Sequence, residues 1–171
     1  MSLSEPKKYS STHIEMCGVF RSRLRDASRF IPDDALAEGG REIEHHLTIL
    51  YGLTSPTPDA VESFAKASCP VSLMTNGVSV FETEEHDVVK IDVISPSAEL
   101  LHSVLKKYVP NEDKWPTYRP HITLAYVKKG LGRVYCAPGL MPAFIGDVFS
   151  SRTLIFSSQN GEKTRLKLEG R

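Results

Sequence analysis

Two short segments of the chain alternate apolar and polar residues after an initial histidine. They are EHHLTILYGL at 44–53 and RPHITLAYV at 119–127. Side chains two positions apart in a strand point to the same face, so His46 lies with Thr48, and His121 lies with Thr123. Each segment therefore predicts a strand that buries one apolar face and carries a His and a Thr on the other.

Further hydrophobic patterns outline the rest of the fold. They predict strands at 9–16, 71–82, 87–95, 133–136, 150–159 and 164–170, and helices at 57–68 and 95–109. Thr57 is the expected N-cap of the first helix, and Asn160-Gly161 is a hairpin signal between the last two strands. The Gly- and Pro-containing segment 18–44 is predicted to be an irregular connection with one helical turn at 33–37.

The predicted elements repeat in one order along the chain. A strand, a helix and a strand begin with the first His segment, and a strand, a helix and a strand end with the second. Because two copies are too few for a solenoid, we predict an α+β fold of two pseudo-symmetric β–α–β lobes, whose antiparallel sheets form a central cleft. A length of 171 residues suits one domain over 1–171.

Composition and charge limit the kinds of molecule that the chain is expected to bind. The chain is 40% hydrophobic, with 21 basic and 21 acidic residues and a net charge of zero. A neutral chain has no general attraction to long nucleic acid or to an anionic membrane, whereas a small anionic ligand can be held by a few local groups. We therefore expect no membrane and no long nucleic acid as partners, while a small anionic ligand stays compatible with neutrality. The chain is also expected to be a monomer.

The chain carries no sign of export. Its N-terminal residues are polar, it has no apolar run long enough to span a bilayer, and its three cysteines are widely spaced. Free thiols are typical of a reducing compartment. We expect a cytoplasmic protein.

The paired His-x-Thr strands suit one chemistry in particular. A neutral imidazole can take a proton from an attacking hydroxyl while a protonated one gives a proton to the leaving oxygen, and the two Thr hydroxyls can donate to phosphate oxygens. A single His in an apolar strand is more often a core residue, but two equivalent ones favour a site. No third ligand at suitable spacing suggests zinc, so no metal or cofactor is expected. His45 points to the opposite face and is expected to be exposed or structural.

The two motifs resemble the signature of the 2H phosphoesterase superfamily, whose members carry two His-x-Thr/Ser motifs in a bilobal α+β fold. The matching stretches are HHLTIL and RPHITLAYV. Within that superfamily the chain is similar to phage proteins of the 2'-5' RNA ligase-like group, through YSSTHIEM, GREIEHHLTILYGL and YRPHITLAYVKKG. That group looks like the one that contains the phage anti-CBASS nucleases, which implies the host cytoplasm as the location if the gene is carried by a phage.

The resemblance implies a metal-independent phosphodiesterase that opens cyclic di- and trinucleotide immune signals such as cGAMP. A ribose 2'-hydroxyl would attack the adjacent 3'-5' phosphodiester. By position, His46 and His121 would be the acid–base pair, and Thr48 and Thr123 the phosphate donors. The sequence does not say which His is the base.

Five further residues are candidates for substrate contacts. Aromatic side chains can stack on nucleobases, which favours Tyr9 in the first strand, and Trp115 and Tyr118 in the loop before the second motif. Arg119 precedes that motif and could hold phosphate. Glu44 shares the face of His46 in an extended chain and could orient its ring.

Two other functions remain open at this stage. A related enzyme could act on RNA ends, at 2',3'-cyclic phosphates or 2'-5' linkages, because these present the same phosphate beside a 2' oxygen. A non-catalytic protein could bind and sequester nucleotides, or serve as a structural component. Intact His and Thr residues in both motifs favour an enzyme.

Overall fold

The computed structural model describes residues 8–170, in which nine strands form one antiparallel sheet. The strands are β1 (Ser10–Glu15), β2 (Leu36–Arg41), β3 (His46–Leu53), β4 (Val71–Glu82), β5 (His86–Ile94), β6 (His121–Lys128), β7 (Ile145–Ser151), β8 (Thr153–Ser157) and β9 (Lys163–Lys167). Their order across the sheet is β7-β4-β5-β6-β3-β1-β8-β9, and β2 pairs with β6 beside this path. The two predicted His strands, β3 and β6, are therefore neighbours at its centre.

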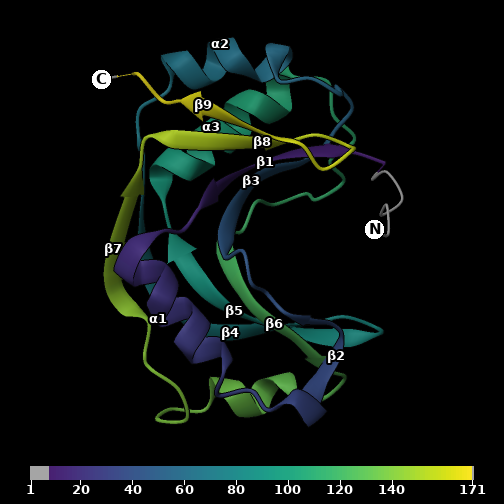
Figure 1. Ribbon diagram of the computed structural model, residues 1–171, viewed down its shortest axis with the longest axis vertical. Coiled ribbons are helices and arrows are strands. Elements are labelled where there is room, and N and C mark those ends of the chain that lie inside the picture. The colour runs from purple at the N-terminus through teal and green to yellow at the C-terminus, as the bar shows by residue number, and fades with distance from the viewer. Residues whose placement is uncertain (1–7, 171) are drawn as a thin grey trace.

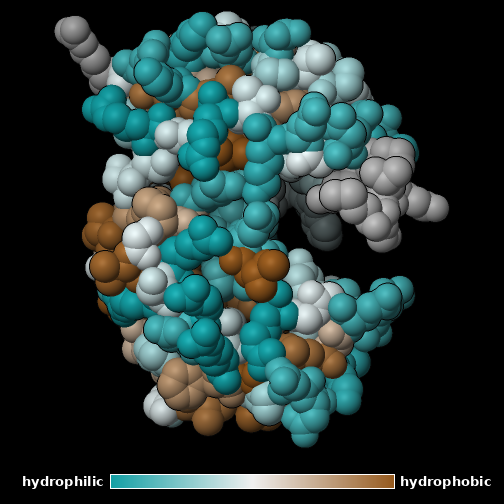
Figure 2. Space-filling model, in the orientation of Figure 1, coloured by the Kyte–Doolittle hydropathy of each residue, from teal (hydrophilic) through white to brown (hydrophobic). Residues whose placement is uncertain are grey.

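The sheet is curled at this centre. The β3–β6 ladder is short, with Leu47 paired to Ile122, while the strands on either side form longer ladders. Figure 1 shows the resulting arrangement, with β1, β8 and β9 in the upper half and β4, β5 and β6 in the lower half. Figure 2 shows that the molecular surface is hollowed between the two halves. The fold is thus the bilobal α+β fold that the pattern predicts.

Three α-helices pack against the sheet in the described part of the chain: α1 (Gly18–Ser28), α2 (Asp59–Ala67) and α3 (Pro96–Tyr108). Two short 3-10 helices, η1 (Asp33–Ala35) and η2 (Gly132–Cys136), lie in the connections. The start of α3 follows from its sequence, because Ser95 accepts a hydrogen bond from the Ala98 backbone N–H and Pro96 needs no partner.

No helix within residues 8–170 has both the length and the apolar character needed to cross a membrane.

One face of the central strands forms the core. Leu47 and Ile49 of β3 and Ile122 and Leu124 of β6 are fully buried. The residues that alternate with them at the start of both strands, which are the His and Thr of each motif, are half-buried on the opposite face. We call this second face, which also carries the alternating residues of β1 and β5 paired with them, the polar face.

The internal repeat differs from the predicted one. The quasi-equivalent units are β1–α1–β3 and β5–α3–β6, because β1 flanks β3 as β5 flanks β6. The prediction placed the first unit over β3, α2 and β4, which was wrong, since β4 pairs with β5 and β7 in the other half. The two helices cross over: α1 contacts β6 and α3 contacts β3 as well as β4, so each motif strand is contacted by the helix of the other unit.

Several local predictions also need correction. The segment 18–44 is not irregular: it contains α1 and β2, and the apolar residues Phe20, Leu24 and Ala27 bury one face of that helix. The predicted strand at 133–136 is the 3-10 helix η2, and β7 lies later. The N-cap of α2 is Pro58, while the Thr57 hydroxyl donates to the Asp59 carboxylate. The helices at 57–68 and 95–109 and the final hairpin strands are confirmed.

Candidate active site

The two His-x-Thr motifs meet on the polar face. Leu47 pairs with Ile122 in an antiparallel ladder, and extending this register by one residue each way sets His46 opposite Thr123 and Thr48 opposite His121. All four side chains are half-buried and reachable from solvent. The charge of His46 also acts on His121, as expected for nearby rings. The structure therefore brings the four predicted site residues into one group.

Both imidazoles are held in the same way. The Nδ1 atom of His46 lies 2.7 Å from the Glu44 carbonyl oxygen, and that of His121 lies 2.8 Å from the Arg119 carbonyl oxygen. A carbonyl oxygen only accepts, so each Nδ1 carries the proton and donates. In the neutral ring Nε2 then keeps the lone pair, and this nitrogen is left to exchange protons with a substrate.

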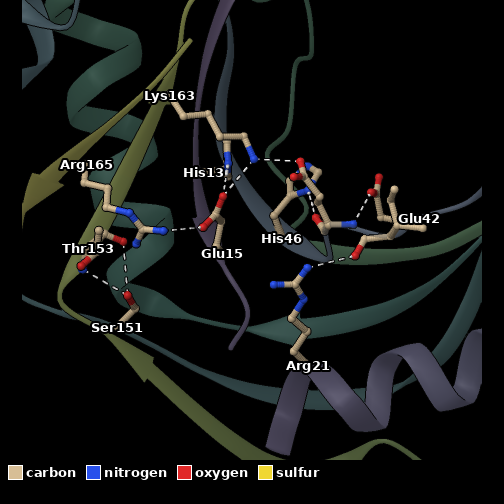
Figure 3. A network of polar contacts seen from close by, with 11 residues as sticks. His13, Glu15, Arg21, Glu42, His46, Ser151, Thr153, Lys163 and Arg165 are labelled. Carbon is tan, nitrogen blue, oxygen red and sulfur yellow. Dashed lines mark hydrogen bonds and ion pairs between the residues drawn. The ribbon is translucent and has the colours of Figure 1, made fainter. Parts of the chain in front are cut away.

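The surroundings of His46 are acidic and tightly paired. The His13 ring lies beside the His46 ring, with centroids 4.9 Å apart. Lys163 of β9 bridges two carboxylates, at 2.9 Å from Glu15 and 2.8 Å from Glu44. Figure 3 shows this network around the start of β3. It ties three separate segments together at the first catalytic candidate.

The network sets the charge of its members. Burial, together with the charge of His46, lowers the pKa of His13 to about 4, so His13 is neutral at working pH. Burial alone would raise the pKa of Glu15, but the hydrogen bond and charge of Lys163 lower it. The hydrogen bond from Lys163 also lowers the pKa of Glu44. Both carboxylates are therefore ionised near His46.

The surroundings of His121 are different. The Phe81 ring meets the His121 ring edge to face, with centroids 5.1 Å apart. Lys90 is 4% exposed; its Nζ lies 4.1 Å from the centroid of the same Phe81 ring and donates to Ser79 and to the Asp92 carboxylate. Burial lowers the pKa of His121, the Arg119 carbonyl opposes this, and the charge of Lys90 lowers the pKa further.

The arrangement fits proton transfer at both ends of one reaction. The register of β3 and β6 sets the two imidazoles and the two Thr side chains next to one another on one face. The described residues include no group of three or more His, Cys, Asp or Glu side chains placed to hold a metal ion. Fixed hydroxyl donors can stabilise charge that develops on a phosphate oxygen, and the imidazoles can act as base and acid.

The five residues predicted to contact the substrate lie in different surroundings and do not form one group. Tyr118 packs inward: its ring stacks on His102 with centroids 4.2 Å apart, and its hydroxyl donates to the Thr48 carbonyl at 2.7 Å. Trp115 is 71% exposed in the loop before β6. Tyr9 donates to Glu112 and meets Tyr51 edge to face.

The other two predicted contact residues, Glu44 and Arg119, bind the motif histidines through their backbone carbonyl groups. The Glu44 and Arg119 carbonyls accept the His46 and His121 hydrogen bonds, and the Glu44 side chain is bound to Lys163. The expected orienting role of Glu44 is thus performed by its carbonyl oxygen. The roles of all five residues in substrate binding stay predictions.

The residues that flank the two motifs are site residues that the strand pattern alone did not predict. His13 and Glu15 of β1, and Lys90 and Asp92 of β5, are paired in register with the two motif strands. A signal was present, because Lys90 interrupts the apolar run DVVKIDVIS at a position that a core strand would give to an apolar residue.

His45 is buried and not exposed. It is 1% exposed, and neither ring nitrogen has a hydrogen-bond partner among the described residues. Burial and the nearby charges of Arg21, His46 and Arg25 lower the pKa of His45 to about 4. It lies outside the polar face and belongs to the packing between β3 and α1.

Comparison with known protein families gives one match. The model of the 2'-5' RNA ligase superfamily matches residues 23–133, which include both His-x-Thr motifs. No curated protein matches the chain.

Solved structures share the fold at low identity. TT0787 of Thermus thermophilus is 18% identical to this chain, with a TM-score of 0.64, and the match covers 95% of this chain and 99% of TT0787. Escherichia coli LigT in complex with phosphate is 18% identical, with a TM-score of 0.61, and the match covers 96% of each chain. Kluyveromyces marxianus Usb1 with uridine monophosphate is 12% identical, with a TM-score of 0.57, and the match covers 95% of this chain and 99% of Usb1. At these identities the similarity establishes the architecture.

Proposed function

The chain belongs to the 2'-5' RNA ligase superfamily of phosphoesterases, and we propose that it is a phosphodiesterase that uses His46 and His121 as its acid–base pair. The observation that carries the proposal is the shared register of β3 and β6, because it sets two carbonyl-tethered imidazoles and two Thr hydroxyls on one face. A group of this kind can act on one phosphate without a bound metal ion.

The proposed reaction begins on the ribose next to the scissile phosphate. One neutral imidazole takes the proton of the 2'-hydroxyl, whose oxygen forms a bond to phosphorus. The bond from phosphorus to the 5' oxygen breaks, and the other, protonated imidazole gives its proton to that oxygen. Thr48 and Thr123 donate to the two non-bridging oxygens. The products carry a 2',3'-cyclic phosphate and a 5'-hydroxyl, and a cyclic substrate becomes linear.

We propose cyclic di- and trinucleotide immune signals as the substrates, which would make the chain an anti-CBASS nuclease of a phage. The support is the motif context YSSTHIEM and GREIEHHLTILYGL together with the neutral chain, which lacks the excess of basic residues that long RNA would favour. Small nucleotides are also found on relatives: E. coli LigT has been solved with 3'-AMP and with ATP.

An apolar surface beside the site could hold a base. Ile94, Met74 and Val148 are cross-strand neighbours on β5, β4 and β7, and they are 43%, 40% and 72% exposed. Ile94 follows Asp92 by two residues, so this trio lies on the polar face next to the residue opposite His121. Exposed apolar side chains on the same face as a polar site favour an aromatic ligand group.

A substrate panel tests the proposal. The protein is incubated with 3',3'-linked cyclic dinucleotides, cyclic trinucleotides, 2'-5' dinucleotides and RNA with a 2',3'-cyclic phosphate end, each with and without EDTA, and products are identified by mass. We expect linear products from the cyclic nucleotides, unchanged by EDTA. Cleavage of the RNA ends or 2'-5' linkages alone would replace the proposed substrate with the related one, and no cleavage of any substrate would leave a nucleotide-binding protein.

A further inference from the structure

The strands that flank the two motifs carry matched triplets. In β1, His13, Ile14 and Glu15 pair with Thr48, Leu47 and His46 of β3. In β5, Lys90, Ile91 and Asp92 pair with Thr123, Ile122 and His121 of β6. Each catalytic His thus faces a carboxylate residue, each Thr faces a basic residue, and the isoleucine between them is fully buried in both halves.

The two basic residues of this repeat differ in charge. His13 is 7% exposed, its pKa is lowered to about 4 by burial and by His46, and its Nε2 stays 3.9 Å from the nearer Glu15 oxygen. It is a neutral ring at working pH. Lys90 is an ammonium group paired with Asp92 and bonded to the Ser79 hydroxyl at 2.7 Å. Of the two triplets, only the one in β5 therefore carries a fixed cation, whereas the cation near the β1 triplet, Lys163, comes from β9 and is shared by Glu15 and Glu44.

The position of Lys90 relates that cation to the reacting phosphate. Residues directly opposite in an antiparallel pair share a face, with Cβ atoms roughly 5 Å apart, so the Lys90 side chain emerges next to Thr123. Its Nζ packs on Phe81, the ring that also meets His121. Ser79 and Asp92 account for two of its three N–H groups, which leaves one donor for a further acceptor.

We propose that Lys90 is a phosphate-binding residue, whose ammonium stabilises the negative charge on the phosphate oxygen held by Thr123. The inference rests on the proposed function and makes the phosphate site asymmetric: Lys90 supplies charge beside Thr123, and His13 supplies none beside Thr48. Asp92 holds the ammonium in place beside Thr123.

The test compares four variants with the parent protein on the best substrate of the panel. We expect Lys90→Met to lower kcat/KM about 100-fold and Lys90→Arg to restore it to within about tenfold of the parent. His13→Met, at the equivalent place in the other half, should lose less than tenfold. Lys66→Met removes an exposed charge from α2 and should stay within twofold. A Lys90→Met protein within threefold of the parent would overturn the proposal.

The pH profile separates an electrostatic role from a purely structural one. The groups that face His121 are Lys90 and Asp92 on β5, Phe81 on β4, His46 on β3 and the Arg119 carbonyl. Since the charge of Lys90 lowers the pKa of His121, its removal should move the limb of the profile that belongs to His121 to higher pH. A loss of amplitude at unchanged pH dependence would contradict the proposal.

A second measurement covers variants that fail to fold and substrates that are not cleaved. Lys90→Met leaves Asp92 unpaired, so Lys90→Met/Asp92→Asn is prepared beside it, and melting curves report folding. The 13Cε signals of the lysines are recorded by NMR, and the signal that is absent from Lys90→Arg is assigned to Lys90. This signal is then followed in the parent protein as 3'-AMP is added. We expect it to shift at saturation, whether or not the panel shows turnover, and an unmoved signal would rule out the contact. Absence of turnover alone refutes the proposed function and leaves this result standing.

Discussion

The Tyr118 hydroxyl donates a hydrogen bond of 2.7 Å to the Thr48 carbonyl oxygen, 70 residues earlier in the chain. This bond joins the loop that leads into the second motif to the strand of the first. The stacking of Tyr118 on His102 of α3, whose Nδ1 lies 2.7 Å from the Ile49 carbonyl oxygen, strengthens the same link. The two halves of the site are therefore fixed relative to each other by a side chain that does not reach the polar face.

Removing this hydroxyl should loosen the site more than the fold. Tyr118→Phe keeps the stacked ring and loses one buried hydrogen bond, so we expect the free energy of unfolding to fall by about 1 kcal/mol. The kcat should fall about tenfold because the motifs are less well positioned. Urea unfolding and turnover measure the two effects. Tyr108→Phe, at a ring that is 59% exposed, should change neither, and a Tyr118→Phe protein with parental kcat would refute the link.

The motif residues should differ in what they contribute. His46→Ala and His121→Ala should each lower kcat by more than about 1000-fold, because either proton transfer is then lost, while nucleotide affinity stays within a few-fold. Thr48→Ala and Thr123→Ala should each cost about 10²–10³-fold. His86→Ala serves as the matched control, since His86 begins β5 and lies away from the centre. Parental turnover in either catalytic variant would show that the acid–base assignment is wrong.

Two buried histidines should make the fold sensitive to acid. The pKa values of His13 and His45 are about 4 in the folded chain, against about 6.5 when unfolded. Between these values the unfolded chain binds more protons, so stability is full above about pH 6.5 and is lost as pH falls toward 4. Each imidazole contributes up to about 3 kcal/mol to this loss.

Urea unfolding at pH 5 and pH 7 measures this effect. His45→Leu removes a buried ring without hydrogen-bond partners among the described residues, so the variant should be more stable than the parent at pH 5 by about 1–3 kcal/mol and should show a flatter pH dependence. Val19→Ala, which changes no titratable group at an exposed residue of α1, should keep the parental slope. An unchanged slope in His45→Leu would mean that this ring is not protonated on unfolding.

Lys163 should matter for the start of β3. Lys163→Met leaves Glu15 and Glu44 facing each other without their shared cation, and the segment that carries the His46 tether should become less ordered. We expect kcat to fall about tenfold, with a partial recovery at high salt, which screens the repulsion. Lys163→Arg should retain most activity. Equal losses in both variants would point to a steric effect in place of a charge effect.

The apolar trio should govern substrate affinity. Met74→Glu places a carboxylate between Ile94 and Val148, so KM for a nucleotide substrate should rise about tenfold while kcat changes little. Val19→Glu makes the same change at a residue of α1 that is 79% exposed and should be silent. If both variants behave alike, the bases bind elsewhere, and Trp115 becomes the next position to vary.

The sequence alone determined those features of the fold that depend on residues close together along the chain. The period of two in a strand placed Thr48 with His46 and Thr123 with His121, and the apolar pattern placed helices at 57–68 and 95–109. The same local reading failed over 18–44, where glycines and a proline suggested a loop although Phe20, Leu24 and Ala27 repeat at helical spacing. It also failed at 133–136, since a short apolar run cannot distinguish a strand from a 3-10 turn.

Only the tertiary structure decided which distant segments share a register. Nothing in the local pattern of HIE or KID shows that one triplet lies against the first motif and the other against the second, because pairing depends on the packing of the whole sheet. The same is true of the crossed helices and of the Lys163 bridge. The sequence pattern thus identifies the His and Thr residues of the site, and the fold determines which charged residues surround them. Electrostatic interactions depend on distance in space and not on separation in sequence.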